Sequence, residues 1–208
     1  MNVLAIYQKY LIPENLQMHM LRVAACGNLI IDHWTGPALN TNSLLRVLLL
    51  HDMGNILKIT PDQIKDSKFL AFREECIAKY GHDDHLLTEA ICTKEGLTPE
   101  EISIMNEKIF MKNDKTLLSD SFMIKIAAYC DQRVAPNGVS SLKERMEEGK
   151  LRYQNRPGTS FNNPRTDEMI AASYEIEKQI MQYCTITPED INDISITPYL
   201  ETLKQYSI

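Results

Sequence analysis

Apolar residues recur at intervals of three and four along almost the whole chain. At this spacing, successive side chains fall on one face of an α-helix. The alternation of apolar and polar residues that is typical of strands is scarce. The sequence therefore predicts an all-α fold, with helices over residues 3–11, 14–34, 42–58, 67–79, 84–95, 99–111, 116–132, 139–155, 165–183 and 197–206.

One segment interrupts the helical pattern near the C-terminal end. Residues 155–164 gather Asn, Pro, Gly, Thr and Ser, which favour loops. This segment could separate a main domain from a C-terminal part, or form a lid. A chain of 208 residues suits one domain with an appended subdomain. We expect residues 1–155 to form a helical core, and residues 156–208 to form the loop and a helical extension packed on that core.

Charge and hydropathy exclude several classes of protein. The net charge of −6, from 22 basic and 28 acidic side chains, disfavours a protein dedicated to duplex DNA. The N-terminal MNVLAIYQKYLIPEN lacks a basic start followed by a long apolar segment, and no apolar run is long enough to span a membrane. The five cysteines are never spaced as CxxC, which favours reduced thiols. We expect a cytoplasmic protein without a membrane partner.

Positive charge is concentrated in residues 133–156, where six basic side chains accompany three acidic ones. Such a run usually forms a solvated helix with ion pairs four residues apart. The alternative is a local surface for a small anionic substrate. The sequence leaves both interpretations open.

His19 occupies a position where a core residue is expected. It follows the helical spacing of Leu16, Val23 and Cys26, which turns the imidazole toward the interior. A single inward histidine is more often a core residue bonded to a carbonyl than a metal ligand. His19 is therefore a candidate metal ligand only if other polar residues lie beside it.

Two further apolar rows contain charged or polar residues. In LLRVLLLHDMGNILKI, His51 and Asp52 stand where the pattern calls for leucine, and in SFMIKIAAYCDQRV the apolar row ends at Asp131. A buried carboxylate costs several kcal/mol unless a cation, a metal or hydrogen bonds stabilise it. For Asp131 the alternative to metal binding is a structural salt bridge with an arginine, Arg22 or Arg133.

Together these segments supply two imidazoles and two carboxylates, from His19, His51, Asp52 and Asp131. Nitrogen and oxygen donors of this kind suit a divalent ion. We expect Mn, Fe, Co, Ni, Zn or Mg, with positions left open for water and substrate.

Three motifs carry these residues: HMLRVA at 19–24, LLLHDMGNI at 48–56 and AAYCDQRV at 127–134. In this order they resemble the motifs of the HD-domain superfamily, whose members are metal-dependent phosphohydrolases. The resemblance covers about residues 15–152, and the segment that follows Asp131 is similar to stand-alone, single-domain HD proteins.

The resemblance implies a helical bundle of the HD-domain type with additional C-terminal helices. It also implies hydrolysis of a nucleotide or a small phosphomonoester by a water that the metal activates. The metal ligands would be His19, His51, Asp52 and Asp131. Asp52 would in addition be the catalytic residue that orients or deprotonates this water.

The chain departs from the family pattern at two places. Asn55 stands where many relatives have Lys, so a positive charge that could meet a phosphate is missing there. His85 matches a histidine of relatives with two metals, but the next expected histidine is absent from EEISIMNEKIFMKN. We therefore expect one divalent ion. His82 and His85 are candidate contacts to substrate or to a weak second metal, or they belong to a helix start capped by Asp83 or Asp84.

Further substrate contacts would come from arginines, because a guanidinium matches a phosphate bidentately. The candidates for substrate binding are Arg22, Asn55, His82, His85, Arg133, Arg145 and Arg152. The expected partner is a small phosphorylated substrate, in particular a nucleotide, and a homodimer is possible. The alternative function is a non-catalytic HD module that binds a nucleotide or a protein as a sensor or scaffold.

Overall fold

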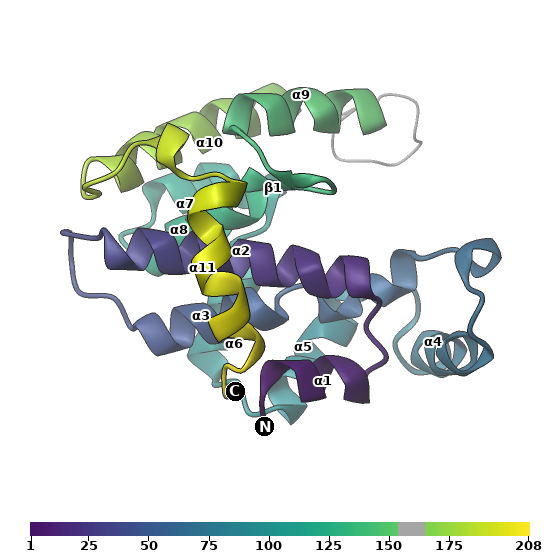
Figure 1. Ribbon diagram of the computed structural model, residues 1–208. Helices are drawn as coiled ribbons and strands as arrows, with labels where there is room; N and C mark the ends of the chain where they lie inside the picture. Colours follow the sequence, from purple (N-terminus) through teal and green to yellow (C-terminus); the bar gives the residue numbers. More distant parts are fainter. Residues whose placement is uncertain (154–164) are drawn as a thin grey trace.

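The computed structural model describes residues 1–153 and 165–208, and the fold is all-α (Figure 1). Within this part of the chain the strands are limited to a short antiparallel hairpin of β1 (Val134–Ala135) and β2 (Gly138–Val139). The predicted fold class is therefore confirmed. The loop predicted at 155–164 lies outside the described residues.

The described residues form eleven α-helices and four short 3-10 helices. The α-helices are α1 (Val3–Lys9), α2 (Glu14–Asp32), α3 (Thr41–Leu50), α4 (Ser67–Tyr80), α5 (Asp84–Lys94), α6 (Pro99–Glu107), α7 (Asn113–Leu118), α8 (Phe122–Arg133), α9 (Leu142–Tyr153), α10 (Arg165–Met181) and α11 (Asp193–Lys204). Short 3-10 helices are η1 (Met53–Lys58), η2 (Pro61–Gln63), η3 (Phe110–Lys112) and η5 (Pro188–Asp190).

The single helix predicted over 42–58 is wrong in its second half. Helix α3 ends at Leu50, and the tighter η1 follows after a turn. The backbone N–H of Gly54 donates to Thr88 Oγ1 at 2.8 Å instead of continuing the α-helix. A Cβ at Gly54 would lie 2.0 Å from the Asp84 carbonyl oxygen. Close packing of η1 on α5 therefore turns the chain out of the helix at this point.

Other helix boundaries also differ from the prediction, and local capping explains two of them. The helix predicted over 116–132 is split into α7 and α8, and the Ser121 side chain caps α8. The last helix begins at Asp193 and not at 197, because the Asn192 side chain accepts from the N–H groups of Ile194 and Ser195. Val139, the first residue of the helix predicted over 139–155, belongs to the β hairpin, and helix α9 begins at Leu142.

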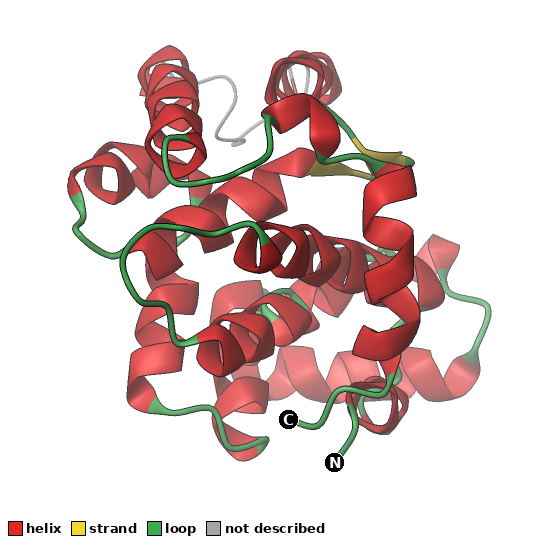
Figure 2. Ribbon diagram, turned by 60° about the vertical axis from the view of Figure 1, so that its left-hand side comes forward, coloured by secondary structure: helices red, strands yellow, loops and turns green. Residues whose placement is uncertain are grey.

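Helix α2 forms the centre of the fold, where it packs on α3, α8 and α11 (Figures 1 and 2). A Cβ at Gly27 would lie 2.3 Å from Leu48 Cδ1 and 3.9 Å from Cys130 Sγ. Glycine at this position therefore lets α2 approach α3 and α8 closely. These are the elements that carry His19, precede His51 and carry Asp131.

The C-terminal helices pack on the earlier ones. Helix α10 contacts α7 and α8, while α11 crosses α2 and also contacts α1. The two ends of the chain meet: the Val3 N–H donates to the Tyr206 carbonyl at 2.9 Å, and the Ile208 N–H donates to the Met1 carbonyl at 3.0 Å. Among the described helices, none combines the length and the apolar character needed to cross a membrane.

Candidate metal centre

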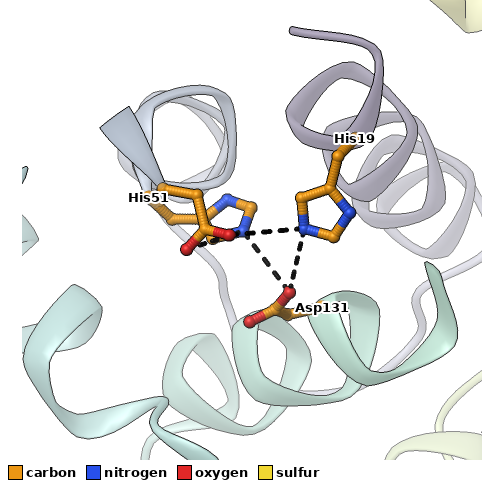
Figure 3. Close-up of side chains that lie close together, drawn as sticks. His19, His51 and Asp131 are labelled. Atoms are coloured by element: carbon orange, nitrogen blue, oxygen red, sulfur yellow. Dashed lines mark ion pairs between the residues drawn. The ribbon is translucent and has the colours of Figure 1, made fainter. Parts of the chain in front are cut away.

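Four side chains from three separate segments of the sequence converge at α2. His19 comes from α2, His51 and Asp52 from the turn after α3, and Asp131 from α8. One ligand atom of each lies within 4.8 Å of the corresponding atoms of the others. Figure 3 shows His19, His51 and Asp131 pointing toward one another. This cluster could hold a metal ion.

Asp131 lies between the two imidazoles. Its Oδ1 is 3.3 Å from His19 Nε2 and 3.4 Å from His51 Nε2. Asp52 closes the cluster from the other side, with Oδ2 at 3.6 Å from His19 Nε2 and Oδ1 at 3.6 Å from His51 Nε2. Two nitrogen and two oxygen donors thus surround one position.

The tautomer of the neutral His51 ring follows from its hydrogen bond. His51 Nδ1 lies 2.7 Å from the Leu48 carbonyl oxygen, which can only accept, so Nδ1 carries a proton. In the neutral imidazole, Nε2 therefore presents a lone pair to the cluster. This Nε2 is buried and has no hydrogen-bond partner among the described residues. A lone pair that faces two carboxylates without a donor fits a cation between them, and a carbonyl bond behind a histidine ligand is common in metal sites.

Asn55 orients Asp52. Its Nδ2 donates to Asp52 Oδ2 at 2.5 Å, across one turn of η1. The two residues meet because the chain changes from α-helix to 3-10 helix after Asp52. The bond fixes the carboxylate plane toward the two imidazoles, a role of Asn55 that the sequence did not indicate.

Lys108, at the C-terminal cap of α6, is the residue of this site that the sequence analysis missed. Its side chain is buried, and Nζ donates to Asp131 Oδ2 at 2.7 Å. The ion pair considered for Asp131 therefore forms with Lys108, not with Arg22 or Arg133. A sequence signal existed: Lys108 follows Ile104 by four residues on the buried face of α6.

Both carboxylates are ionised at neutral pH. Burial raises the pKa of Asp131, but the Lys108 ammonium and then the charged form of His51 outweigh it and hold the pKa well below its usual range. For Asp52, burial and the Asp131 charge raise the pKa, but the charged form of His51, then Lys108 and the charged form of His19, lower it by more, so the pKa is lowered overall. The charges needed to bind a cation are thus present.

The cluster is partly accessible to solvent. The His51 side chain is fully buried, whereas 23% of His19, 22% of Asp52 and 28% of Asp131 are exposed. A water molecule or a small ligand from solution can therefore reach the cluster without opening the core.

Arg133 lies two residues beyond Asp131 but is occupied elsewhere. It is buried, and its guanidinium donates to the carbonyls of Ser140, Pro188 and Ile191 and to the hydroxyl of Tyr129. These bonds join α8 to the segment that precedes α11. The structure thus gives Arg133 a packing role, in contrast to the predicted contact with substrate.

The other candidate arginines are also paired within the protein. Arg22 Nε lies 3.9 Å from Asp193 Oδ1 on α11. On α9, Arg145 and Arg152 both form ion pairs with Glu148, at spacings of three and four residues. This matches the interpretation of the basic segment as a helix with internal ion pairs.

His82 and His85 are exposed and lie outside the four-residue cluster. Asp83 caps α5, since its Oδ1 accepts from the Leu86 N–H at 2.9 Å. His85 Nε2 is 3.9 Å from Asp84 Oδ2. The structure therefore supports the interpretation of this stretch as a capped helix start.

The chain matches no protein-family model, no curated protein and no solved structure.

Proposed function

We propose that this chain is a metal-dependent phosphohydrolase of the HD-domain type, acting on a nucleotide or a small phosphomonoester. The observation that carries the proposal is the buried, unpartnered Nε2 of His51, which faces the carboxylates of Asp52 and Asp131. With His51 neutral and no metal ion here, this nitrogen would be left unsatisfied in the interior, which is costly. The resemblance of the three sequence motifs to HD-domain proteins supports the same function.

The metal would be one divalent ion, held by His19, His51, Asp52 and Asp131. A mixed set of imidazole nitrogen and carboxylate oxygen suits Mn, Fe, Co, Ni or Zn, and Mg is the hard alternative. When bound, such an ion lowers the pKa of a coordinated water from about 15.7 toward about 7 and polarises a phosphoryl oxygen.

The side chains of the chain itself complete the mechanism. Asp52 takes a proton from the attacking water, because its carboxylate is ionised and Asn55 fixes its orientation. The Leu48 carbonyl keeps His51 in the tautomer that offers Nε2. The exposed edge of the cluster admits the substrate from solution.

We also place the protein in the cytoplasm. Its five cysteines are free thiols, and four of them are buried. Thiols of this kind are typical of reducing compartments.

The test is phosphate release from a panel of nucleoside monophosphates and small phosphomonoesters, with Mn, Co, Ni, Zn, Fe or Mg supplied in turn. The wild type is compared with Asp52→Ala. Asp167→Ala is the matched control, since Asp167 is an exposed carboxylate on α10 that pairs with Lys150. We expect metal-dependent turnover in the wild type and the control, and none in Asp52→Ala.

The alternative is a non-catalytic module. The pairing of the candidate arginines with protein groups favours it, since fewer cations remain for a phosphate. If the wild type retains about one metal ion per chain but turns over no phosphoester, the hydrolase is wrong. The metal site would then serve a sensor or a scaffold.

A further inference from the structure

Lys108 has an unusual environment for a lysine. Its side chain is 6% exposed, and it lies where α6 ends, against the Asp131 side of the cluster. Buried lysines are rare unless they are paired. The partner, Asp131, is also a member of the candidate metal centre.

The hydrogen bonds of the Lys108 ammonium are incomplete. An ammonium group has three N–H donors. Across residues 1–153 and 165–208, Asp131 Oδ2 is the one acceptor that Nζ contacts. Buried polar groups in native proteins normally satisfy their hydrogen bonds, so donors left over beside an accessible site point to a ligand.

Asp131 connects the ammonium to the cluster. Its Oδ1 faces His19 Nε2 and His51 Nε2, and its Oδ2 holds Lys108 Nζ. The Asp131 carboxylate therefore lies between the Lys108 ammonium and the candidate metal position. A ligand with several oxygens, such as a phosphoryl group, can place one oxygen on the metal and another on the ammonium.

The charge of the occupied site leads to the same conclusion. The carboxylates of Asp52 and Asp131 would cancel the two charges of a divalent ion, so Lys108 supplies the net positive charge. In the part of the chain that the structure describes, Lys108 is the one lysine or arginine that forms an ion pair with a cluster residue. It thus supplies the cation that the neutral Asn55 does not.

We propose that Lys108 is the anion-binding residue of this site and donates to a phosphoryl oxygen of the bound substrate. The inference rests on the proposed phosphohydrolase and names the residue that recognises its substrate class. It also explains how a site with one metal ion and few available arginines could bind a phosphate, because a charge-assisted hydrogen bond from a buried ammonium is strong.

The competing role is that of a counter-ion, in which Lys108 merely neutralises Asp131. A counter-ion would affect metal binding and folding, whether or not an anion is bound. An anion-binding residue would change the affinity for phosphate while the metal stays in place. Phosphate affinity and metal content must therefore be measured on the same protein.

The probe is inorganic phosphate, titrated by calorimetry into the protein loaded with Co²⁺, with metal content measured for each sample. The variants are Lys108→Met, Lys108→Gln and Lys108→Arg. Lys125→Met is the matched control, because Lys125 is equally buried, on α8, with its ammonium over the Phe122 ring. Lys108→Gln also covers the case in which Lys108→Met does not fold.

We expect phosphate affinity to fall by about 10-fold to 100-fold in Lys108→Met and Lys108→Gln, with metal content unchanged. Lys108→Arg should keep most of the affinity, and Lys125→Met all of it. The proposal is overturned if the Lys108 variants bind phosphate as the wild type does. Loss of metal in both neutral variants, or a wild type that binds no phosphate, overturns it as well.

The two proposals can fail separately. If phosphate binding depends on Lys108 but the protein hydrolyses no compound of the panel above, the anion site is supported and the hydrolase proposal is wrong. If Lys108→Met still hydrolyses the substrate and binds phosphate as the wild type does, the hydrolase is supported and the proposed role of Lys108 is wrong.

Discussion

Two buried polar clusters lie on α8 only two residues apart, and they differ in how their hydrogen bonds are satisfied. Around Arg133, backbone carbonyls and a tyrosine hydroxyl accept from the guanidinium. Around Asp131, and within the part of the chain that the structure describes, His51 Nε2 has no hydrogen-bond partner and the Lys108 ammonium has one acceptor. The same helix thus carries one cluster that the protein completes and one that it leaves incomplete.

This difference separates structural from functional use of buried charge. A charge whose partners all come from the same chain stabilises the fold, because removing it leaves those partners unsatisfied. A cluster with unused donors and lone pairs is completed by something that binds. The comparison therefore predicts that mutations at Arg133 act on stability, and that mutations around Asp131 act on binding.

The largest expected effect is on stability. Arg133→Met should lower the free energy of unfolding by about 3–5 kcal/mol, because the acceptors on Ser140, Pro188 and Ile191 lose their donor in the interior. Denaturant unfolding measures this change. Arg152→Met is the control and should lose less than about 1 kcal/mol, since its ion pair lies at the surface. A loss of metal binding without a loss of stability in Arg133→Met would break the comparison.

The second effect is on metal affinity. His51→Gln should weaken binding of Co²⁺ by more than about 100-fold, because removing a ligand costs more than removing a partner behind a ligand. Calorimetry with Co²⁺ gives the dissociation constant. His33→Gln should bind as the wild type does, since His33 pairs with Thr185 away from the cluster. Equal affinity of the two variants would contradict the ligand role of His51.

The third effect is the stabilisation that the metal itself provides. A divalent ion at 100 times its dissociation constant should stabilise the folded protein by about 2.7 kcal/mol. For a chain of this length, the melting temperature should rise by about 5–10 °C. Thermal unfolding with and without a chelator measures the shift. His51→Gln should show no shift, and a shift of equal size in that variant would place the metal elsewhere.

The fourth effect links the fold to the site. In Gly54→Ala the new Cβ would lie 2.0 Å from the Asp84 carbonyl oxygen and 2.6 Å from Thr88 Oγ1. We expect a loss of about 1–3 kcal/mol in unfolding free energy, and weaker metal binding because η1 must move with Asp52. Thermal unfolding and a Co²⁺ titration test both. Unchanged metal affinity in a destabilised variant would show that η1 does not position Asp52.

The smallest effect is a difference in pH dependence. The lowered pKa of Asp131 means that its charge stabilises the metal-free protein above the unfolded pKa of about 3.9. This contribution is lost as the pH falls through the lower folded pKa. The stability difference between wild type and Asp131→Asn should therefore shrink below about pH 4. For Arg133→Met it should change less, because the carbonyl acceptors do not titrate and the Glu177 carboxylate lies farther away, at 3.8 Å from Nη1. Thermal unfolding from pH 7 to pH 3 distinguishes the two clusters.

Much of the fold was predictable because its signal is local. Apolar spacing and capping residues such as Thr98 and Pro99 depend on neighbours within one turn, and the helices α2, α5 and α6 follow from them. The four candidate ligands were also predictable, since each interrupts an apolar row. Their convergence in one cluster agrees with the set that the sequence indicated.

The sequence by itself determined the all-α class and the identity of the four candidate ligands. Only the tertiary structure decided which polar groups meet: Lys108 with Asp131, 23 residues apart, and Gly54 with Thr88, 34 residues apart. It also decided that Arg133 serves the packing of the C-terminal segment. The physical reason is that helical periodicity fixes which face of a helix is buried, whereas the partner on that face depends on how distant helices pack.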